Sequence, residues 1–219
     1  MSQEPLEVGM LLYPGFTLLD LVGPLTALWM HSNIYLFWKT LEPVISDSGK
    51  AMVPTATLAK RPAKLDVLFV PGGFGTPTAM EDAELIAFLR DAARQSVYIT
   101  SVCSGSLILG AAGLLNGYQA TTHWAAHEQL KSFGAVPVKA RVVADRNRIT
   151  GGGVTAGIDF GLAVLAKLRG VGEAQFVQLA MEYDPQPPFD CGSPEEAAPA
   201  IVQRVREMIA RLPDAQTAG

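Results

Sequence analysis

Short apolar runs alternate along the chain with longer segments in which apolar residues recur every three or four positions. Runs of the first kind predict buried strands at 7–12, 34–40, 65–70 and 97–102. Segments of the second kind separate these runs and predict helices. Strands that are apolar on both faces and separated by helices favour a mostly parallel sheet with helices on both faces. We therefore expect a doubly wound α/β fold.

The ends of several helices are marked in the sequence. A helix is expected to begin near 21–24, with Pro24 in its first turn. Proline lacks a backbone N–H, and only the first turn of a helix does not need that group for a helical hydrogen bond. Asp82 is a suitable cap for a helix that runs to Arg94 with one apolar stripe. Further helices are expected at 106–112, at 124–133 and after 153, and short strands at 51–56, 120–122, 136–138 and 141–144.

The whole chain, 1–219, is interpreted as one domain that ends in a proline-rich connector at 184–194 and a closing amphipathic helix at 195–212. With 49% hydrophobic and 17% charged residues, the sequence has enough apolar material for a substantial core. The net charge is −4 and the basic residues are scattered, so we expect neither nucleic acid nor a membrane as a partner. Residues 1–15 lack the apolar core of a secretory signal, which indicates a cytoplasmic location.

Cys103 lies at the corner where the strand at 97–102 ends and a helix begins. Unpaired backbone N–H groups at a helix start attract negative charge, so this position is expected to lower the thiol pKa and make the sulfur a nucleophile. Its neighbours are small, as a sharp elbow requires: Ser101, Ser104, Gly105 and Ser106. The alternative is a buried cysteine that only fills apolar space. Cys191 forms no CxxC pair with it, so no zinc site is indicated, and we expect no chemical role for Cys191.

Asp20 is an acidic residue in an apolar segment that follows the first predicted strand. In open α/β sheets ligands gather beyond the carboxyl ends of the strands, here beyond Leu12, Val70 and Val102. If the fold brings Asp20 next to Cys103, a thiolate raises the carboxyl pKa, and the protonated acid can donate a hydrogen bond to sulfur. The alternative role is a helix cap.

Three further positions have weaker signals. Gly72 and Gly73 follow a predicted strand, where their N–H groups either face a developing negative charge or form an ordinary turn. His123 is a candidate general base, although a lone histidine beside a helix start is more often a structural hydrogen-bonding residue. The glycines at 151–153 match neither GxxxxGK[ST] nor GxGxxG, so no nucleotide is expected and Gly152 is interpreted as supporting close backbone packing.

Four segments together resemble the ThiJ/PfpI superfamily, the flavodoxin-like relatives of class I glutamine amidotransferases. They are 70-VPGG-73, 101-SVCSGSLILGAAGLL-115, 120-ATTHW-124 and 150-TGGGVTAGIDF-160. The resemblance extends over nearly the whole chain and implies a flavodoxin-like fold and a homodimer. Within the superfamily, 19-LDLVGP-24 and 182-EYDPQPPFDCGSP-194 are similar to the isocyanide hydratases.

This resemblance implies an enzyme without metal or organic cofactor, which hydrates a small organic isocyanide to an N-substituted formamide through a covalent cysteine thioimidate. Cys103 matches the nucleophile, Asp20 the catalytic carboxyl group, and Ser104 a site that usually holds threonine. Gly72 and Gly73 are expected to help position sulfur and charge. The residues expected to line an apolar substrate pocket are Leu19, Trp124 and Val154, with His123 and Gly152 in supporting roles.

Other activities of the superfamily fit less well. Peptidase-like members carry histidine directly after the cysteine, where this chain has Ser104, and glyoxalase-like members carry glutamate where it has Asp20. Regulators with a similar amino-terminal half add a helix-turn-helix domain, for which we expect no room after Phe160. Two alternatives stay open. One is a noncatalytic redox sensor or binding module that uses Cys103, and the other is a glyoxalase-like enzyme for small dicarbonyls.

Overall fold

The computed structural model describes residues 4–211 and contains a seven-stranded central sheet. Its strands lie in the order β10 (Val142–Asp145), β11 (Arg148–Gly151), β7 (Ser96–Val102), β6 (Leu65–Val70), β1 (Leu6–Leu11), β2 (Ser32–Trp38) and β5 (Ala56–Thr57). Every neighbouring pair is parallel except β10 and β11, which are antiparallel. The predicted doubly wound, mostly parallel α/β fold is therefore confirmed.

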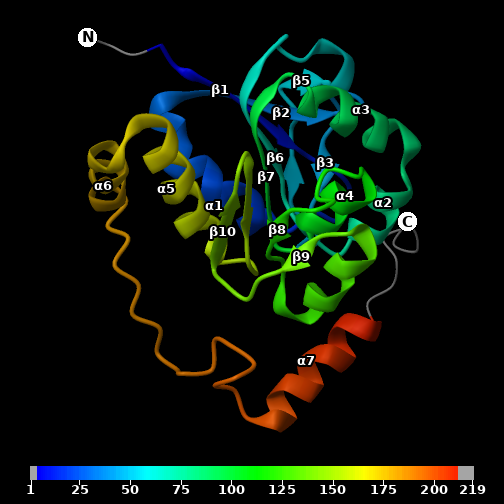
Figure 1. Ribbon diagram of the computed structural model, residues 1–219, viewed down its shortest axis with the longest axis vertical. Helices are drawn as coiled ribbons and strands as arrows, with labels where there is room; N and C mark the ends of the chain where they lie inside the picture. Colours follow the sequence, from blue (N-terminus) through cyan, green and yellow to red (C-terminus); the bar gives the residue numbers. More distant parts are fainter. Residues whose placement is uncertain (1–3, 212–219) are drawn as a thin grey trace.

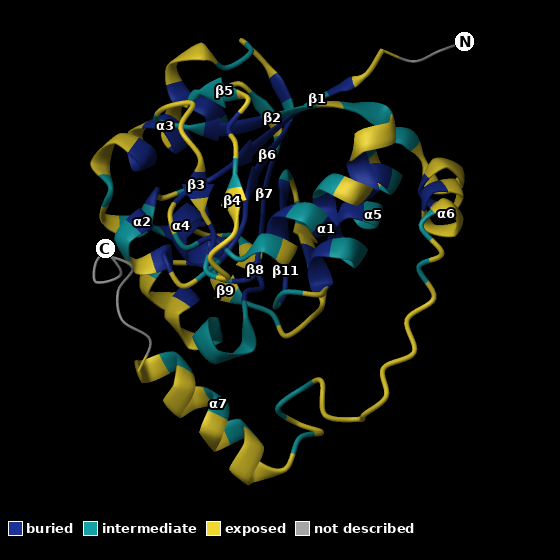
Figure 2. Cartoon of the chain, turned by 180° about the vertical axis from the view of Figure 1, so that it is seen from behind, coloured by how far each residue is buried: buried dark blue, intermediate teal, exposed yellow. Residues whose placement is uncertain are grey.

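Helices cover both faces of this sheet. Figure 1 shows α1, α5 and α6 on one side and α2, α3 and α4 on the other. Their bounds are α1 (Leu18–Leu28), α2 (Thr76–Glu81), α3 (Ala83–Ala93), α4 (Gly105–Ala111), α5 (Ala156–Arg169) and α6 (Val171–Ala180). The central strands β1 and β6 are buried at nearly every position because helices pack on both of their faces (Figure 2).

Several short elements differ from the prediction. The segment at 51–56 contains two strands, β4 (Ala51–Met52) paired with β3 (Val44–Ile45), and β5 in the main sheet. The strands predicted at 120–122 and 136–138 pair outside the main sheet, as β8 (Gln119–Ala120) and β9 (Val136–Pro137). Strand β11 and helices α2 and α6 were not predicted. Three segments are 3-10 helices, η1 (Trp29–His31), η2 (Leu58–Lys60) and η3 (Trp124–Phe133), and η3 lies where a helix was predicted at 124–133.

Helix α1 begins at Leu18, earlier than expected, and Pro24 lies inside it rather than in its first turn. A proline at this position removes one helical N–H, which normally destabilises the helix. The cost is offset by packing, since Pro24 lies against Gly157 and Gly161 of α5, where an added methyl group would come within 3.1 Å of it. Because α1 begins at Leu18, Asp20 lies in its first turn, where the side chain is buried.

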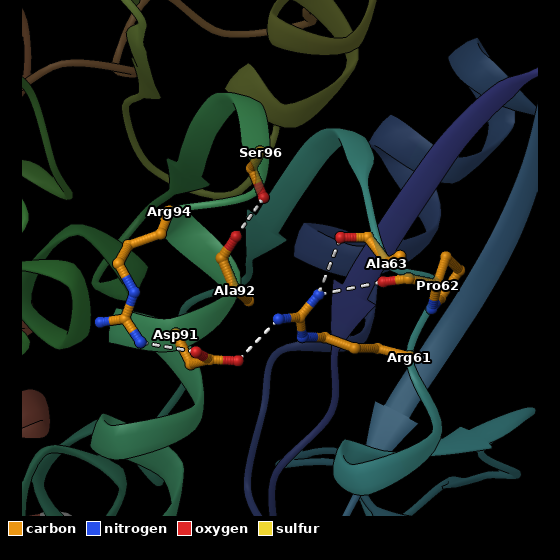
Figure 3. Close-up of polar contacts among 7 residues, drawn as sticks. All are labelled: Arg61, Pro62, Ala63, Asp91, Ala92, Arg94 and Ser96. Atoms are coloured by element: carbon orange, nitrogen blue, oxygen red, sulfur yellow. Dashed lines mark hydrogen bonds and ion pairs between the residues drawn. The ribbon is translucent and has the colours of Figure 1, made fainter.

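The predicted cap of α3 is confirmed, because the Asp82 carboxylate accepts hydrogen bonds from the N–H groups of Glu84 and Leu85. At the other end of α3, Asp91 binds Arg61 and Arg94, each at 2.6 Å, and so ties the segment before β6 to this helix (Figure 3). These ion pairs lie at the protein surface and contribute little to stability.

The closing helix, α7 (Pro199–Arg211), begins four residues later than predicted, and the predicted last residue, Leu212, lies outside the described residues. Pro199 opens the helix, where the lack of an N–H is harmless. A connector without helix or strand leads to α7, which lies below the body of the protein and has no buried residue (Figures 1 and 2). In the part of the chain that the structure describes, no helix is long and apolar enough to cross a membrane.

Candidate active site

The carboxyl ends of three adjacent strands place the candidate residues at one edge of the sheet. Strands β1, β6 and β7 are neighbours, and they lead into α1, into the loop with Gly72 and Gly73, and into Cys103. Because all three strands are parallel, the segments that follow them meet in space. The structure thus brings Asp20, Gly72 and Cys103 together, as the strand pattern predicted.

Cys103 forms a strained elbow between β7 and α4. Its φ is 52°, in the left-handed region that side chains other than glycine rarely adopt. The bend is held by its own backbone, since the Cys103 N–H donates to the carbonyl oxygens of Gly151 and Gly152 at 3.1 and 2.9 Å. Its carbonyl oxygen accepts a 2.8 Å hydrogen bond from the Thr122 hydroxyl. The elbow therefore fixes where the sulfur points.

The small residues around the elbow allow three backbone segments to approach one another. A methyl group on Gly72 would lie 2.5 Å from the Ser104 nitrogen and 2.8 Å from the Cys103 Cβ, and one on Gly105 would strike the carbonyl oxygen of Val70. Inside the elbow, the hydroxyls of Ser101 and Ser106 are 2.9 Å apart, and Ser106 donates to the Thr121 carbonyl. Larger residues would force these segments apart.

Asp20 is fully buried and turned away from a helix-capping role. Its Oδ2 accepts a 2.9 Å hydrogen bond from the Gly72 N–H, and no side-chain hydrogen bond caps α1. Its Oδ1 has no conventional hydrogen-bond partner within residues 4–211. Burial is the largest effect on this carboxyl group and raises the pKa of Asp20 to about 7. Hydrogen bonding with the Cys103 thiol acts in the opposite direction and lowers this pKa.

The Cys103 thiol does not show the net effect expected from a helix start. Burial raises its pKa, and the negative charge of Asp20 raises it further. The backbone N–H groups of Ser104 and Val154 point at the sulfur and oppose this rise, but burial dominates. Cys103 and Asp20 therefore form a buried pair that holds at least one proton at neutral pH, with two N–H donors ready to stabilise a thiolate.

The N–H groups of Gly72 and Gly73 are already bound to protein groups. Gly72 donates to Asp20, and Gly73 donates to the Ser104 hydroxyl oxygen at 3.0 Å. These two N–H groups hold Asp20 and Ser104 in place. They therefore do not face a developing negative charge on the substrate, which was the expected role. Ser104 in turn contacts the Thr76 hydroxyl at 2.8 Å.

His123 has the geometry of a structural residue. Its Nδ1 accepts a hydrogen bond from the Ala125 N–H and so caps η3, and burial lowers the pKa of its imidazole. A neutral ring with one nitrogen engaged by the backbone is of limited use as a base. It nevertheless lies between two cavities and lines both.

An apolar cavity of about 370 Å³ opens beside Cys103. Its floor includes Cys103, Ser104 and Val154, and its walls are mainly apolar: Phe74, Met80, Leu107, Ala126, Val205, Met208 and Ile209. Val154 lies where the sequence analysis expected it. Leu19, 39% exposed on α1, is not among the described residues that line this cavity, and Trp124 lines a separate, more polar cavity of about 770 Å³.

Sequence reasoning missed two groups of residues at this site. Val205, Met208 and Ile209 of α7 share one helix face, a stripe that is visible in the sequence, but the pattern does not say that α7 covers the cavity. Tyr13 and Thr76 carry no motif at all. They reach Ser104 only through the fold.

Comparisons with known proteins agree on the family. The model of the DJ-1/PfpI family matches residues 7–167. The isonitrile hydratase of Pseudomonas putida is 51% identical over 207 residues, which cover 94% of this chain and 90% of that protein. The regulator GbdR of Pseudomonas aeruginosa is 32% identical and matches 77% of this chain but 48% of its own length.

Solved structures give the same result. A ThiJ/PfpI family protein from Pseudomonas syringae has a TM-score of 0.93 and 52% identity over 95% of this chain and 88% of its own. DJ-1beta of Drosophila melanogaster, at 23% identity over 81% of this chain and 98% of its own, has a TM-score of 0.73 and shares the fold. The chain belongs to the DJ-1/PfpI family.

Proposed function

We propose that this chain hydrates organic isocyanides to N-substituted formamides, with Cys103 as the nucleophile and Asp20 as the proton-transfer group. The observation that carries the proposal is the buried Cys103–Asp20 pair, whose cysteine lines an apolar cavity. The proposal is also supported by the similarity, over 94% of this chain, to the isonitrile hydratase of Pseudomonas putida. Isonitrile is another word for isocyanide.

In the first step, the thiol adds across the terminal carbon of the isocyanide. The Cys103 sulfur forms a bond to that carbon, and the proton that the pair holds is delivered to the same carbon through Asp20, giving a thioimidate. The N–H groups of Ser104 and Val154 stabilise the sulfur while it carries negative charge. No electron leaves or enters the system, so no redox cofactor is needed.

In the second step, water adds to the thioimidate carbon. The Asp20 carboxylate takes one proton from this water and passes a proton to the substrate nitrogen. Collapse of the adduct breaks the carbon–sulfur bond, releases the formamide and returns the remaining proton to Cys103. One water is consumed and both protein groups regain their starting states.

The cavity suits a substrate with an apolar substituent, because the walls beyond Cys103 and Ser104 are mainly apolar. Phe74 and Met80 lie on the main body, and Val205, Met208 and Ile209 lie on α7. Burial of the substituent among these side chains supplies binding energy, while the isocyanide carbon reaches the sulfur. The redox-sensor alternative uses the same cavity-lining thiol but predicts its oxidation without turnover, so turnover separates the two roles.

The test is formamide production from a simple alkyl or aryl isocyanide, measured by liquid chromatography for wild type, Cys103→Ala and Asp20→Asn. We expect turnover by wild type without added cofactor and its loss in both variants. Methylglyoxal is the matched comparison substrate. Turnover of methylglyoxal but not of any isocyanide would replace the proposal with the dicarbonyl alternative, and turnover of neither would favour a binding or redox role.

A further inference from the structure

A row of linked hydroxyl groups, those of Tyr13, Thr76 and Ser104, runs from the end of β1 to the active site, and we call it the hydroxyl relay. Tyr13 and Thr76 are 1% and 3% exposed, and Ser104 lies at the cavity floor. The Tyr13 hydroxyl is 3.0 Å from the Pro71 carbonyl oxygen and 3.2 Å from the Thr76 hydroxyl, which is 2.8 Å from the Ser104 hydroxyl. The Gly73 N–H lies 3.0 Å from the same Ser104 oxygen.

The groups at the two ends of the relay determine the direction of every proton in it. The Pro71 carbonyl can only accept, so Tyr13 donates to it, and burial raises the pKa of Tyr13 and keeps this proton in place. Thr76 then donates to the Tyr13 oxygen, and Ser104 donates to Thr76. The Gly73 N–H can only donate, so Ser104 accepts from it. Four contacts are satisfied by four protons.

The opposite direction satisfies fewer contacts. If Thr76 donated to Ser104, the Ser104 proton would be left with the Gly73 carbonyl oxygen at 3.4 Å or with the cavity, and the Tyr13–Thr76 contact would contain no proton. Buried hydroxyls favour the arrangement in which each short contact has its proton. The Ser104 proton therefore points to Thr76.

We propose that Tyr13 and Thr76 are positioning residues that hold the Ser104 hydroxyl as a hydrogen-bond acceptor for the water that hydrolyses the Cys103 adduct. The Ser104 oxygen donates once and accepts once within the chain, which leaves one lone pair for a group in the cavity. A water bound there is oriented beside the adduct. This inference rests on the proposed hydration chemistry and assigns a task to its second step.

Loss of the relay frees the Ser104 proton to turn into the cavity. Thr76→Val removes the acceptor of that proton. Tyr13→Phe makes Thr76 donate to Ser104 instead, which displaces it. In either variant we expect the freed hydroxyl to turn its proton into the cavity that Cys103 also lines, where it lowers the thiol pKa and no longer offers a lone pair to water. Two variants serve as controls. Thr76→Ser keeps the hydroxyl group, and Thr78→Val makes the threonine-to-valine change two residues further along α2.

The experiment measures steady-state kinetics with one isocyanide and, separately, the pH dependence of the ultraviolet absorbance of the thiolate. Subtraction of the Cys103→Ala spectrum removes the contribution of Cys191. We expect Thr76→Val and Tyr13→Phe to lower kcat about tenfold and KM in parallel, leaving kcat/KM within about twofold, because only adduct hydrolysis slows. Mass spectrometry should then show accumulated adduct.

The thiolate titration is expected to move to lower pH by about one unit in both variants, with Thr76→Ser and Thr78→Val close to wild type. This second measurement separates the relay from the proposed function, since it needs no substrate. If wild type hydrates no isocyanide but the titration shifts, the proposed function fails and the hydroxyl polarity stands. An unchanged titration, or a fall in kcat/KM without adduct accumulation, would overturn the relay.

Discussion

The Gly72 N–H donates a 2.9 Å hydrogen bond to Oδ2 of Asp20 and so joins the loop after β6 to the first turn of α1. This bond leaves Oδ1 without a hydrogen-bond partner among residues 4–211, and Cys103 is the side chain that acts on the pKa of this carboxyl group. One backbone donor thus divides the carboxyl group into an anchored oxygen and a reactive one. The predictions about the acid follow from this division.

Asp20→Asn is expected to abolish proton transfer while keeping the anchor. The amide oxygen can still accept from Gly72, but the side chain can neither give nor take a proton at neutral pH. We expect kcat for isocyanide hydration to fall by at least about a hundredfold. Asp190→Asn on the exposed connector is the matched control and should keep wild-type activity. Equal activity of the two variants would contradict the role of Asp20.

The same carboxyl group should make stability depend on pH. Its pKa is about 7 in the folded protein against an ordinary value of 3.8, so the folded state holds a proton that the unfolded chain releases. The free energy of unfolding should therefore fall between about pH 4 and pH 7, by about 1.4 kcal/mol per unit, and level off above that range. Urea unfolding of wild type and Asp20→Asn at several pH values measures this difference, and parallel pH dependence would contradict it.

Cys103→Gly is expected to be more stable than Cys103→Ala. Both lack the nucleophile, but the left-handed backbone at this position costs an alanine about 1 kcal/mol that a glycine does not lose. The midpoint of urea unfolding should be higher for the glycine variant, and neither should hydrate an isocyanide. A lower midpoint for Cys103→Gly would show that the elbow is not strained.

The sequence predicted local structure well where a single segment decides it. The strand at 65–70 and the Asp82 cap of α3 are as expected, because apolar runs and capping side chains act over a few residues. The beginning of α1 was misplaced because Pro24 is accommodated by glycines on α5, far along the chain. The same limit hid the Tyr13–Thr76 contact, which joins residues 63 positions apart.

Gly72→Ala is expected to damage both stability and activity. Its added methyl group would lie 2.5 Å from the Ser104 nitrogen and 2.7 Å from the Ser104 hydroxyl oxygen, and backbone cannot yield there without moving the elbow. We expect a loss of about 1–3 kcal/mol in the free energy of unfolding. Gly172→Ala is the control, since nothing lies within 4 Å of its added methyl and alanine favours helix α6. Similar stability of the two variants would contradict the crowding.

Met208→Ala is expected to change substrate preference rather than chemistry. Met208 belongs to the α7 wall of the cavity, distant in sequence from Cys103, so its removal takes apolar contact away from the substituent of the isocyanide. KM for a bulky alkyl isocyanide should rise about tenfold, whereas KM for methyl isocyanide and kcat for both should change little. Arg204→Ala, on the same helix but outside this cavity lining, should match wild type with both substrates. An equal effect of Met208→Ala on both isocyanides would mean that α7 does not contact the substituent, and the bulky substrate would then have to lie against the body of the protein.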